Sequence, residues 1–155
     1  MDMEGEWDRP KLGGEEMKTD AVDGRKTGVI IVPHGSRTQE STGVYEAIAQ
    51  KVGKRIAYDV QVGYMKHGKP NVVDAIKNFV RGGVKKIIIV PLFIVPGLHV
   101  RDDIPVLLGL KEGAPKFDYG NADIPDDVEI LYAQHIGADD RLVDVVIDRA
   151  KGVMR

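Results

Sequence analysis

The chain has 155 residues, a formal net charge of −2 and a pI of about 6.1, so it is long enough for one domain with a sizeable core and shows no basic excess that would indicate a nucleic-acid partner. It contains no cysteine, which excludes disulfides, thiolate metal sites, iron–sulfur clusters and cysteine nucleophiles, so any metal chemistry must use His, Asp or Glu. It has neither an apolar run long enough to span a membrane nor the core of a signal peptide, so we expect a cytoplasmic protein with no membrane partner.

The first 26 residues are polar and mixed in charge, and they show no helical or strand periodicity around Trp7. We predict a flexible N-terminal extension over residues 1–26, followed by a single domain over residues 27–155. The alternative is an arm that packs Trp7 against a partner subunit.

The first strand and helix are expected between residues 28 and 56. Gly28–Val32 is a short apolar strand, and His34 follows it in a turn. Ser36 and Gln39 have the spacing of a capping box, so a helix is predicted to begin near Ser36. Apolar residues then recur every four positions and form one helix face: Val44, Ile48, Val52 and Ile56.

A second strand is predicted over Tyr58–Met65, where apolar and polar residues alternate. Pro70 suits the first turn of the helix that follows. Gly82 and Gly83 are expected to end that helix.

The most hydrophobic stretch is Ile87–Val95, which is interrupted only by Pro91. Because it is apolar on both faces, it predicts a central strand of a parallel sheet, covered by helices on both sides. The chain then turns at Pro96-Gly97 and reaches His99, followed at once by charged residues: Arg101, Asp102 and Asp103. Ligands of open α/β sheets bind outside the carboxyl ends of the strands, which makes this segment the first functional clue.

The remaining elements complete an alternating pattern. Ile104 and Pro105 are expected to open a short helix, residues 111–127 read as a loop, and Val128–Tyr132 is a fourth strand. Asp139 and Asp140 favour the start of a last helix that runs to Gly152. This alternation predicts right-handed βαβ units and an α/β fold with a mostly parallel four-stranded sheet.

Two of the four histidines, His34 and His99, fall just past the ends of two predicted strands. If these strands are neighbours, both imidazoles face one cleft, where neutral imidazole can bind cobalt, nickel, iron or zinc and can accept protons near neutral pH. For His67 and His135 we favour solvent exposure, although His135 also follows a strand and could line the same cleft.

Charged residues accompany the two histidines. Arg37 and Arg101 could bind carboxylates or phosphates, and solvated surface arginines are an equally good interpretation. Asp102 and Asp103 could be metal ligands, but an acidic pair before a helix is more often a helix N-terminal charge arrangement. No glycine-rich phosphate-binding motif is present, so nucleotide binding has no specific support.

Three segments carry a resemblance to a known family: HGSR at residues 34–37, VPLFIVPGLHVRDDIP at residues 90–105, and IGADDRLVDVVIDRA at residues 136–150. They closely resemble the short, archaeal-type CbiX chelatases, which are class II chelatases that insert cobalt or nickel into sirohydrochlorin. The nickel-specific members, called CfbA, start the pathway to the nickel tetrapyrrole coenzyme of methanogenesis.

The resemblance implies a flavodoxin-like, three-layer chelatase domain that works as a symmetric homodimer, with Co²⁺ or Ni²⁺ as substrate and no permanently bound cofactor. It implies a lyase of cobalamin or nickel-coenzyme biosynthesis, in which His34 and His99 are metal ligands and proton acceptors. The residues beside them are then expected to hold the sirohydrochlorin ring and its carboxylates: Gly35, Ser36, Arg37, Gly97, Leu98 and Arg101. We expect the short helix after Ile104 to provide the dimer contact or, equally, to be buried against its own sheet.

Two departures from the family pattern keep alternatives open. Lys66 stands where many relatives have a glutamate, and residues 111–127 contain no histidine, so this loop is not expected to store metal. The alternatives are an iron chelatase for sirohaem and a non-catalytic carrier of metal or tetrapyrrole.

Overall fold

A computed structural model of the protein describes residues 26–112 and 122–154. The predicted N-terminal extension, except for Lys26, lies outside the described residues, and so do residues 113–121 of the expected loop. Lys26 belongs to the folded body, because its carbonyl accepts hydrogen bonds from the backbone N–H groups of Lys85 and Lys86 at 3.0 and 3.2 Å.

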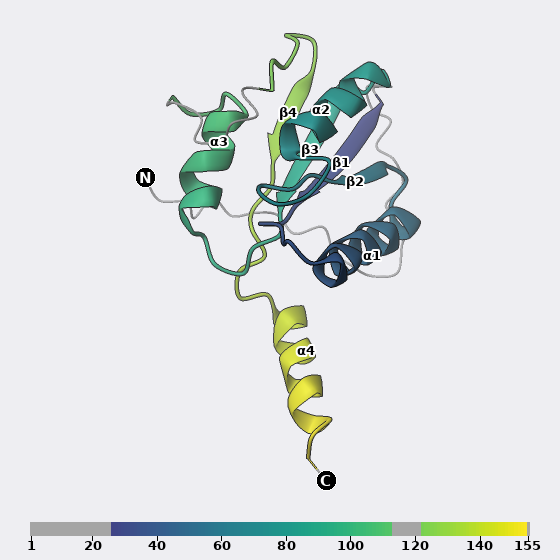
Figure 1. The fold of residues 1–155 in the computed structure, drawn as a ribbon, viewed down its shortest axis with the longest axis vertical. Helices are drawn as coiled ribbons and strands as arrows, with labels where there is room; N and C mark the ends of the chain where they lie inside the picture. Colours follow the sequence, from purple (N-terminus) through teal and green to yellow (C-terminus); the bar gives the residue numbers. More distant parts are fainter. Residues whose placement is uncertain (1–25, 113–121, 155) are drawn as a thin grey trace.

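Strands and helices alternate along the described residues, and every pair of neighbouring strands is parallel (Figure 1). The elements in chain order are β1 (Thr27–Val32), α1 (Gln39–Arg55), β2 (Asp59–Val62), α2 (Val72–Arg81), β3 (Lys86–Pro91), the π-helical turn η1 (His99–Asp103), α3 (Ile104–Leu107), β4 (Glu129–Tyr132) and α4 (Asp140–Lys151). The strand order is β2-β1-β3-β4. The predicted flavodoxin-like α/β fold with a parallel four-stranded sheet is confirmed.

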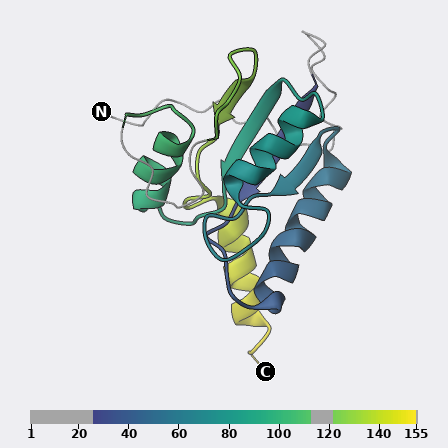
Figure 2. The same ribbon diagram turned by 45° about the horizontal axis from the view of Figure 1, so that its top comes forward.

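Two apolar clusters place the helices in layers on the two faces of the sheet. On one face, α2 and α3 pack over the larger cluster, which includes Ile30, Ile87 and Ile89 of the sheet. On the other face, α1 packs over a smaller cluster built on Val29 and Ile31. Figure 2 shows α2 lying across the sheet and α1 running beside β2. The result is a three-layer body with β1 and β3 at its centre.

The prediction that helices cover both faces of β3 is only half right. Ile87 and Ile89 are fully buried, whereas Ile88 and Val90, which point to the other face, are only half-buried. Leu131 of β4 lies in register with Ile88 and is 41% exposed. Because α1 packs over β1 and β2, no helix among the described residues covers this face of β3 and β4.

The first helix begins two residues later than the capping-box spacing predicted. The N-cap is Thr38, whose hydroxyl accepts a hydrogen bond from the backbone N–H of Ser41 at 3.3 Å. The Ser36 hydroxyl instead accepts from the backbone N–H of Thr38 at 3.2 Å, which holds the turn before the helix. Both residues are good caps, so the spacing alone could not choose between them.

Helix α2 begins and ends close to the predicted positions. Its N-cap is Asn71, whose side chain accepts from the backbone N–H of Asp74 at 2.9 Å, and Pro70 lies just before this cap. Gly82 ends the helix as expected.

Two roles were expected for the short helix after Ile104, a dimer contact or packing against its own sheet, and burial decides between them. Leu107 is 2% exposed and Leu108 is 5% exposed, and both belong to the larger core cluster. The helix therefore packs against its own sheet, whereas Leu110 beyond its end is exposed.

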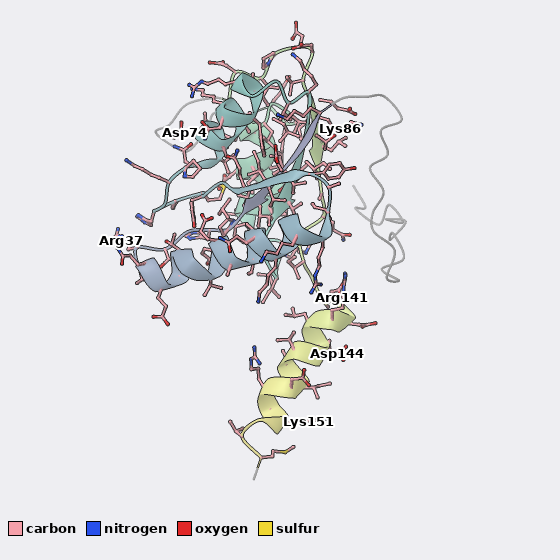
Figure 3. All side chains as sticks on the ribbon, turned by 90° about the vertical axis from the view of Figure 1, so that its right-hand side faces the viewer. Arg37, Asp74, Lys86, Arg141, Asp144 and Lys151 are labelled. Carbon is pink, nitrogen blue, oxygen red and sulfur yellow. The ribbon has the colours of Figure 1, made fainter. Side chains whose placement is uncertain are left out.

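Helix α4 begins at the predicted N-cap, because the Asp139 carboxylate accepts from the backbone N–H of Arg141 at 2.9 Å. It then leads away from the three-layer body, and none of its residues is buried (Figures 1 and 3). Neither α4 nor any other helix of the described segments is long and apolar enough to cross a membrane.

Candidate functional site

A histidine follows each of the four parallel strands. In the order of the strands across the sheet these are His67 after β2, His34 after β1, His99 after β3 and His135 after β4. All four therefore lie beyond the carboxyl edge of the sheet. We expected His34 and His99 to face one cleft if the strands before them are neighbours. The pairing of β1 with β3 confirms that these strands are neighbours.

The gap between β1 and β3 is also where the strand order reverses direction. From β1 the chain crosses to β2 on one side, and it then returns over β1 to β3 on the other side. Ligands of open α/β sheets bind at this switch point, because the loops that follow the two strands diverge there. His34 and His99 flank it, so these two residues stand where a ligand of this fold is expected.

The His34 turn is fixed by close backbone contacts with the loop after β2. The backbone N–H of Lys66 donates to the His34 carbonyl at 2.8 Å, and the N–H of Met65 donates to the Pro33 carbonyl at 3.2 Å. Gly35 has φ of +110°, and a Cβ at this position would lie 1.6 Å from the Lys66 carbonyl oxygen. Only glycine fits there, so Gly35 lets the two turns pack together, with the exposed His34 beside them, and its expected contact with the substrate stays a prediction.

The segment that begins at His99 is held near its start by hydrogen bonds from two directions. The Gly97 carbonyl accepts hydrogen bonds from the backbone N–H groups of Val100 and Arg101, both at 3.2 Å. From β4, the Tyr132 hydroxyl donates to the carbonyl of the buried Val100 at 2.8 Å. A tyrosine hydroxyl carries its proton at neutral pH, and burial raises the pKa of Tyr132 further above its ordinary value, so the donor is also kept at moderately alkaline pH. The backbone just after His99 is thus fixed by the loop before it and by β4.

Between β3 and His99 the chain presents apolar side chains to solvent. Ile94, Val95 and Leu98 are each at least 60% exposed, and Gly97 is exposed with them. An exposed apolar loop beside two histidines suits the face of a flat, partly apolar ligand. The predicted ring-covering role of Gly97 and Leu98 fits this surface.

Exposed cations flank the two histidine turns. Arg37 lies just before the N-cap of α1 and extends into solvent in Figure 3, and Arg101 is exposed within η1. Lys66 adds a third exposed cation, and its backbone is bonded to His34. Ser36, also predicted as a substrate contact, is half-buried and bonded within its own turn.

The acidic pair after Arg101 has structural roles. Asp102 forms an ion pair with Lys111, and Asp103 is buried at the start of α3. The structure favours a charge arrangement at the start of a helix over metal ligation. Among the described side chains, no three His, Asp or Glu residues gather closely enough to hold one metal ion.

The remaining two histidines differ in burial. His67 is exposed, as expected, with φ of +49° in its turn. His135 is half-buried and lies beyond β4 at the same edge as His99, so its interpretation as a simple surface residue does not hold. Sequence reasoning also missed Tyr132, although strand alternation already places it on the same face as Ile130.

The three-layer fold and the histidines beyond the carboxyl edge of the sheet together define a flavodoxin-like α/β protein whose switch point is flanked by His34 and His99. The family model for CbiX matches residues 28–153, and the chain belongs to the CbiX family. It is 37% identical over 141 residues to the sirohydrochlorin cobaltochelatase of Methanococcus maripaludis, covering 81% of this chain and 98% of that protein. It is 38% identical over 139 residues to the enzyme of the same name from Methanocaldococcus jannaschii, covering 80% of this chain and 97% of that protein.

A solved structure has the same fold. The sirohydrochlorin chelatase SirB from Bacillus subtilis subspecies spizizenii, in complex with cobalt, superimposes with a TM-score of 0.71 at 22% identity. The match covers 83% of this chain and 51% of SirB. At this identity the likeness concerns the fold.

Proposed function

We propose that this protein is a sirohydrochlorin cobaltochelatase, a metal chelatase that inserts Co²⁺ into sirohydrochlorin and releases two protons. The observation that carries the proposal is the placement of His34 and His99 on the two sides of the β1/β3 switch point, in a member of the CbiX family. Curated relatives at 37–38% identity that bear this name, matched over nearly their whole length, support it.

The reaction needs two kinds of help that neutral imidazoles can provide. The metal must exchange water for nitrogen ligands, and the two pyrrole N–H protons of the macrocycle must leave as two new metal–nitrogen bonds form. In our proposal His34 and His99 bind the ion on one face of the ring and accept the departing protons. Holding ring and ion together then supplies proximity.

The carboxylates and the apolar face of the macrocycle need separate partners. We assign the carboxylates to the exposed cations at the edge of the sheet, Arg37 and Arg101, with Lys66 beside His34. Gly35 and Ser36 shape the His34 turn, and the exposed loop that contains Gly97 and Leu98 contacts the apolar part of the ring. The positive charge of Lys66 suits carboxylate binding better than metal delivery.

Cobalt is the metal named for the similar enzymes, and Ni²⁺ is our proposed alternative substrate because imidazole sites bind Ni²⁺ at least as tightly as Co²⁺. We also propose a homodimer, because one chain offers a single set of strand-end turns to a ring with two faces, and a two-fold axis would place two such sets across one cavity.

The proposal is tested by following the absorbance of sirohydrochlorin when purified protein is mixed with the ring and Co²⁺, Ni²⁺ or Fe²⁺ in turn. Insertion with Co²⁺ should exceed the spontaneous rate and continue past one ring per chain. His34→Ala and His99→Ala should each lower the rate to near the spontaneous value while circular dichroism stays that of the parent. His67→Ala, an exposed histidine at the same edge, is the matched control and should change the rate little.

Three outcomes would contradict parts of this proposal. Retention of one ring per chain without release of the metallated product indicates a carrier instead of an enzyme. A His99→Ala variant that inserts Co²⁺ at the parent rate removes His99 from the site, and a clear preference for Fe²⁺ makes the protein an iron chelatase for sirohaem.

A further inference from the structure

The turns around His34 and His99 carry positive charge that the protein itself does not neutralise. Four exposed cationic side chains lie beyond the carboxyl edge of the sheet: Arg37, Lys66, Lys69 and Arg101. Within residues 26–112 and 122–154, none of these four side chains forms a hydrogen bond or an ion pair. A surface with unpaired charge of one sign attracts ligands of the opposite sign and repels ions of its own sign.

The acids that follow the same strands are engaged in other contacts. Three of them are paired or buried: Asp102 with Lys111, Asp139 with Arg141, and Asp103 at the start of α3. Three others are exposed, and each lies in the first turn of a helix: Glu40, Asp74 and Asp140. A carboxylate in that position is balanced by the positive end of the helix dipole. The charge of the four cations is therefore not cancelled.

The loop after β2 keeps Lys66 close to His34. Tyr64 closes the base of this loop, because its N–H donates to the Pro70 carbonyl at 3.0 Å. The buried ring of Tyr64 packs on Gly68, where an added Cβ would lie 2.3 Å from the ring. The middle of the loop is tied to the His34 turn by the N–H of Lys66, which donates to the His34 carbonyl at 2.8 Å. The Lys66 charge thus stays within about 10 Å of an ion at His34, which is one Debye length at 0.1 M salt.

A site made of His34 and His99 offers a divalent ion no compensation for this charge. Neutral imidazoles carry none, and among the described side chains no group of three His, Asp or Glu residues could hold a metal ion. In a water-like dielectric, a unit positive charge about 10 Å away weakens the binding of a divalent ion about fourfold. The free protein is therefore a poor site for Co²⁺, whereas a ring that carries carboxylates is attracted to it.

We propose that sirohydrochlorin binds before the metal. The unpaired cations repel Co²⁺ from the free protein, and the carboxylates of the ring remove this repulsion when they bind. The inference rests on the proposed function and adds an order of binding to it. Because coupling between two ligands is reciprocal, a bound ring raises the affinity for Co²⁺ by the same factor by which bound Co²⁺ raises the affinity for the ring.

Calorimetric titration with Co²⁺ alone tests the repulsion. At an ionic strength of about 0.01 M, Lys66→Gln should bind Co²⁺ about fourfold more tightly than the parent, and Lys66→Arg should match the parent. At about 0.15 M the difference should fall below about twofold, because salt screens the charge. Lys51→Gln is the matched control, since Lys51 is exposed about 18 Å along α1 from its first residue, and it should bind Co²⁺ like the parent. The Lys66 side chain makes none of the backbone bonds that hold the loop, so its variants should keep the parent fold.

The order itself is measured by trapping. Protein is first mixed with radiolabelled Co²⁺ and then added to sirohydrochlorin with a large excess of unlabelled Co²⁺. Binding of the ring first predicts a product labelled only to the level of the diluted pool. In the reverse experiment, protein is first mixed with sirohydrochlorin and then added to Co²⁺ with a large excess of a competing polycarboxylate porphyrin. The ring that was bound first should then be converted to product in the first turnover.

The contrary results are distinct from failure of the proposed function. Label in the product above the level of the diluted pool overturns the order, because the metal bound first would then be used. Equal Co²⁺ affinities of the parent and Lys66→Gln at low salt also overturn it, because Lys66 would not act on the ion. The titrations need no turnover, so a protein that shows the expected shifts without inserting the metal contradicts the proposed function and retains the repulsion on which this inference depends.

Discussion

Tyr132→Phe removes one hydroxyl and keeps the ring in its packing site. The lost hydrogen bond joins the Tyr132 hydroxyl to the Val100 carbonyl at 2.8 Å, one residue after His99. A hydrogen bond of this kind contributes about 1 kcal/mol net, and leaving the carbonyl of a buried residue without its donor raises the cost toward about 3 kcal/mol. For a domain of this size, each 1 kcal/mol corresponds to a fall of about 2–4 °C in Tm.

The same substitution should change the response to alkaline pH. The folded-state pKa of Tyr132 is raised above its ordinary value of 10.0 by burial, so the hydroxyl ionises more readily in the unfolded chain. This group therefore contributes stability that is fully present below pH 10 and is lost as pH rises further. The parent should lose about 1.4 kcal/mol more per pH unit above 10 than Tyr132→Phe does.

Urea unfolding measured from pH 8 to 11, together with the Co²⁺ insertion rate at neutral pH, checks this reasoning. If the poorer orientation of the turn that carries His99 raises the activation free energy of insertion by about 1 kcal/mol, the insertion rate should fall about fivefold. Tyr58→Phe, at the opposite edge strand, is the matched control and should leave the rate unchanged. Equal Tm values and equal alkaline slopes for parent and Tyr132→Phe would refute the idea that this hydroxyl holds the turn.

Three further predictions concern stability. Gly35→Ala should cost about 3 kcal/mol or more in urea unfolding because its Cβ meets the Lys66 carbonyl, whereas Gly43→Ala, with no atom near its Cβ, should be neutral or slightly stabilising; equal stabilities would contradict the close contact. Ile89→Ala should cost about 2–5 kcal/mol by the same measurement, since Ile89 is fully buried, and a cost below 1 kcal/mol would count against its place in the core. A chain that begins at Lys26 should keep the parent Tm and the parent insertion rate, and loss of soluble protein would show that the extension is structural.

Much of the architecture could be predicted because strong local patterns agree with the tertiary structure. The apolar run over Ile87–Val95, interrupted only by Pro91, predicted the central strand β3, which ends at that proline, and the caps at Asp139 and Gly82 were placed correctly. Alternation of strands and helices then left few topologies, since βαβ crossovers are right-handed. The placement of His34 and His99 just past the ends of two strands was predicted in the same way, whereas the pairing of those two strands was left open by the sequence and is given by the structure.

Other features depend on contacts that no local pattern contains. Either Ser36 or Thr38 could have capped α1, and the choice depends on which hydroxyl the turn uses. Tyr132 reaches Val100 across 32 positions of sequence, so its role appears only in three dimensions. The apolar side of α4 predicts a partner for the helix, but it carries no information about which chain provides that partner.

The contact between Gly35 and Lys66 makes the geometry of the His34 turn independent of the side chain that residue 66 carries. The loop after β2 uses only backbone atoms of residue 66 to hold the His34 turn: an N–H group that donates at 2.8 Å and a carbonyl oxygen that excludes any Cβ from residue 35. The side chain of residue 66 takes no part in these bonds and points to solvent. An acid and a base are therefore interchangeable there without moving the histidine, so evolution can reverse the charge beside His34 in a single substitution while the fold stays as it is.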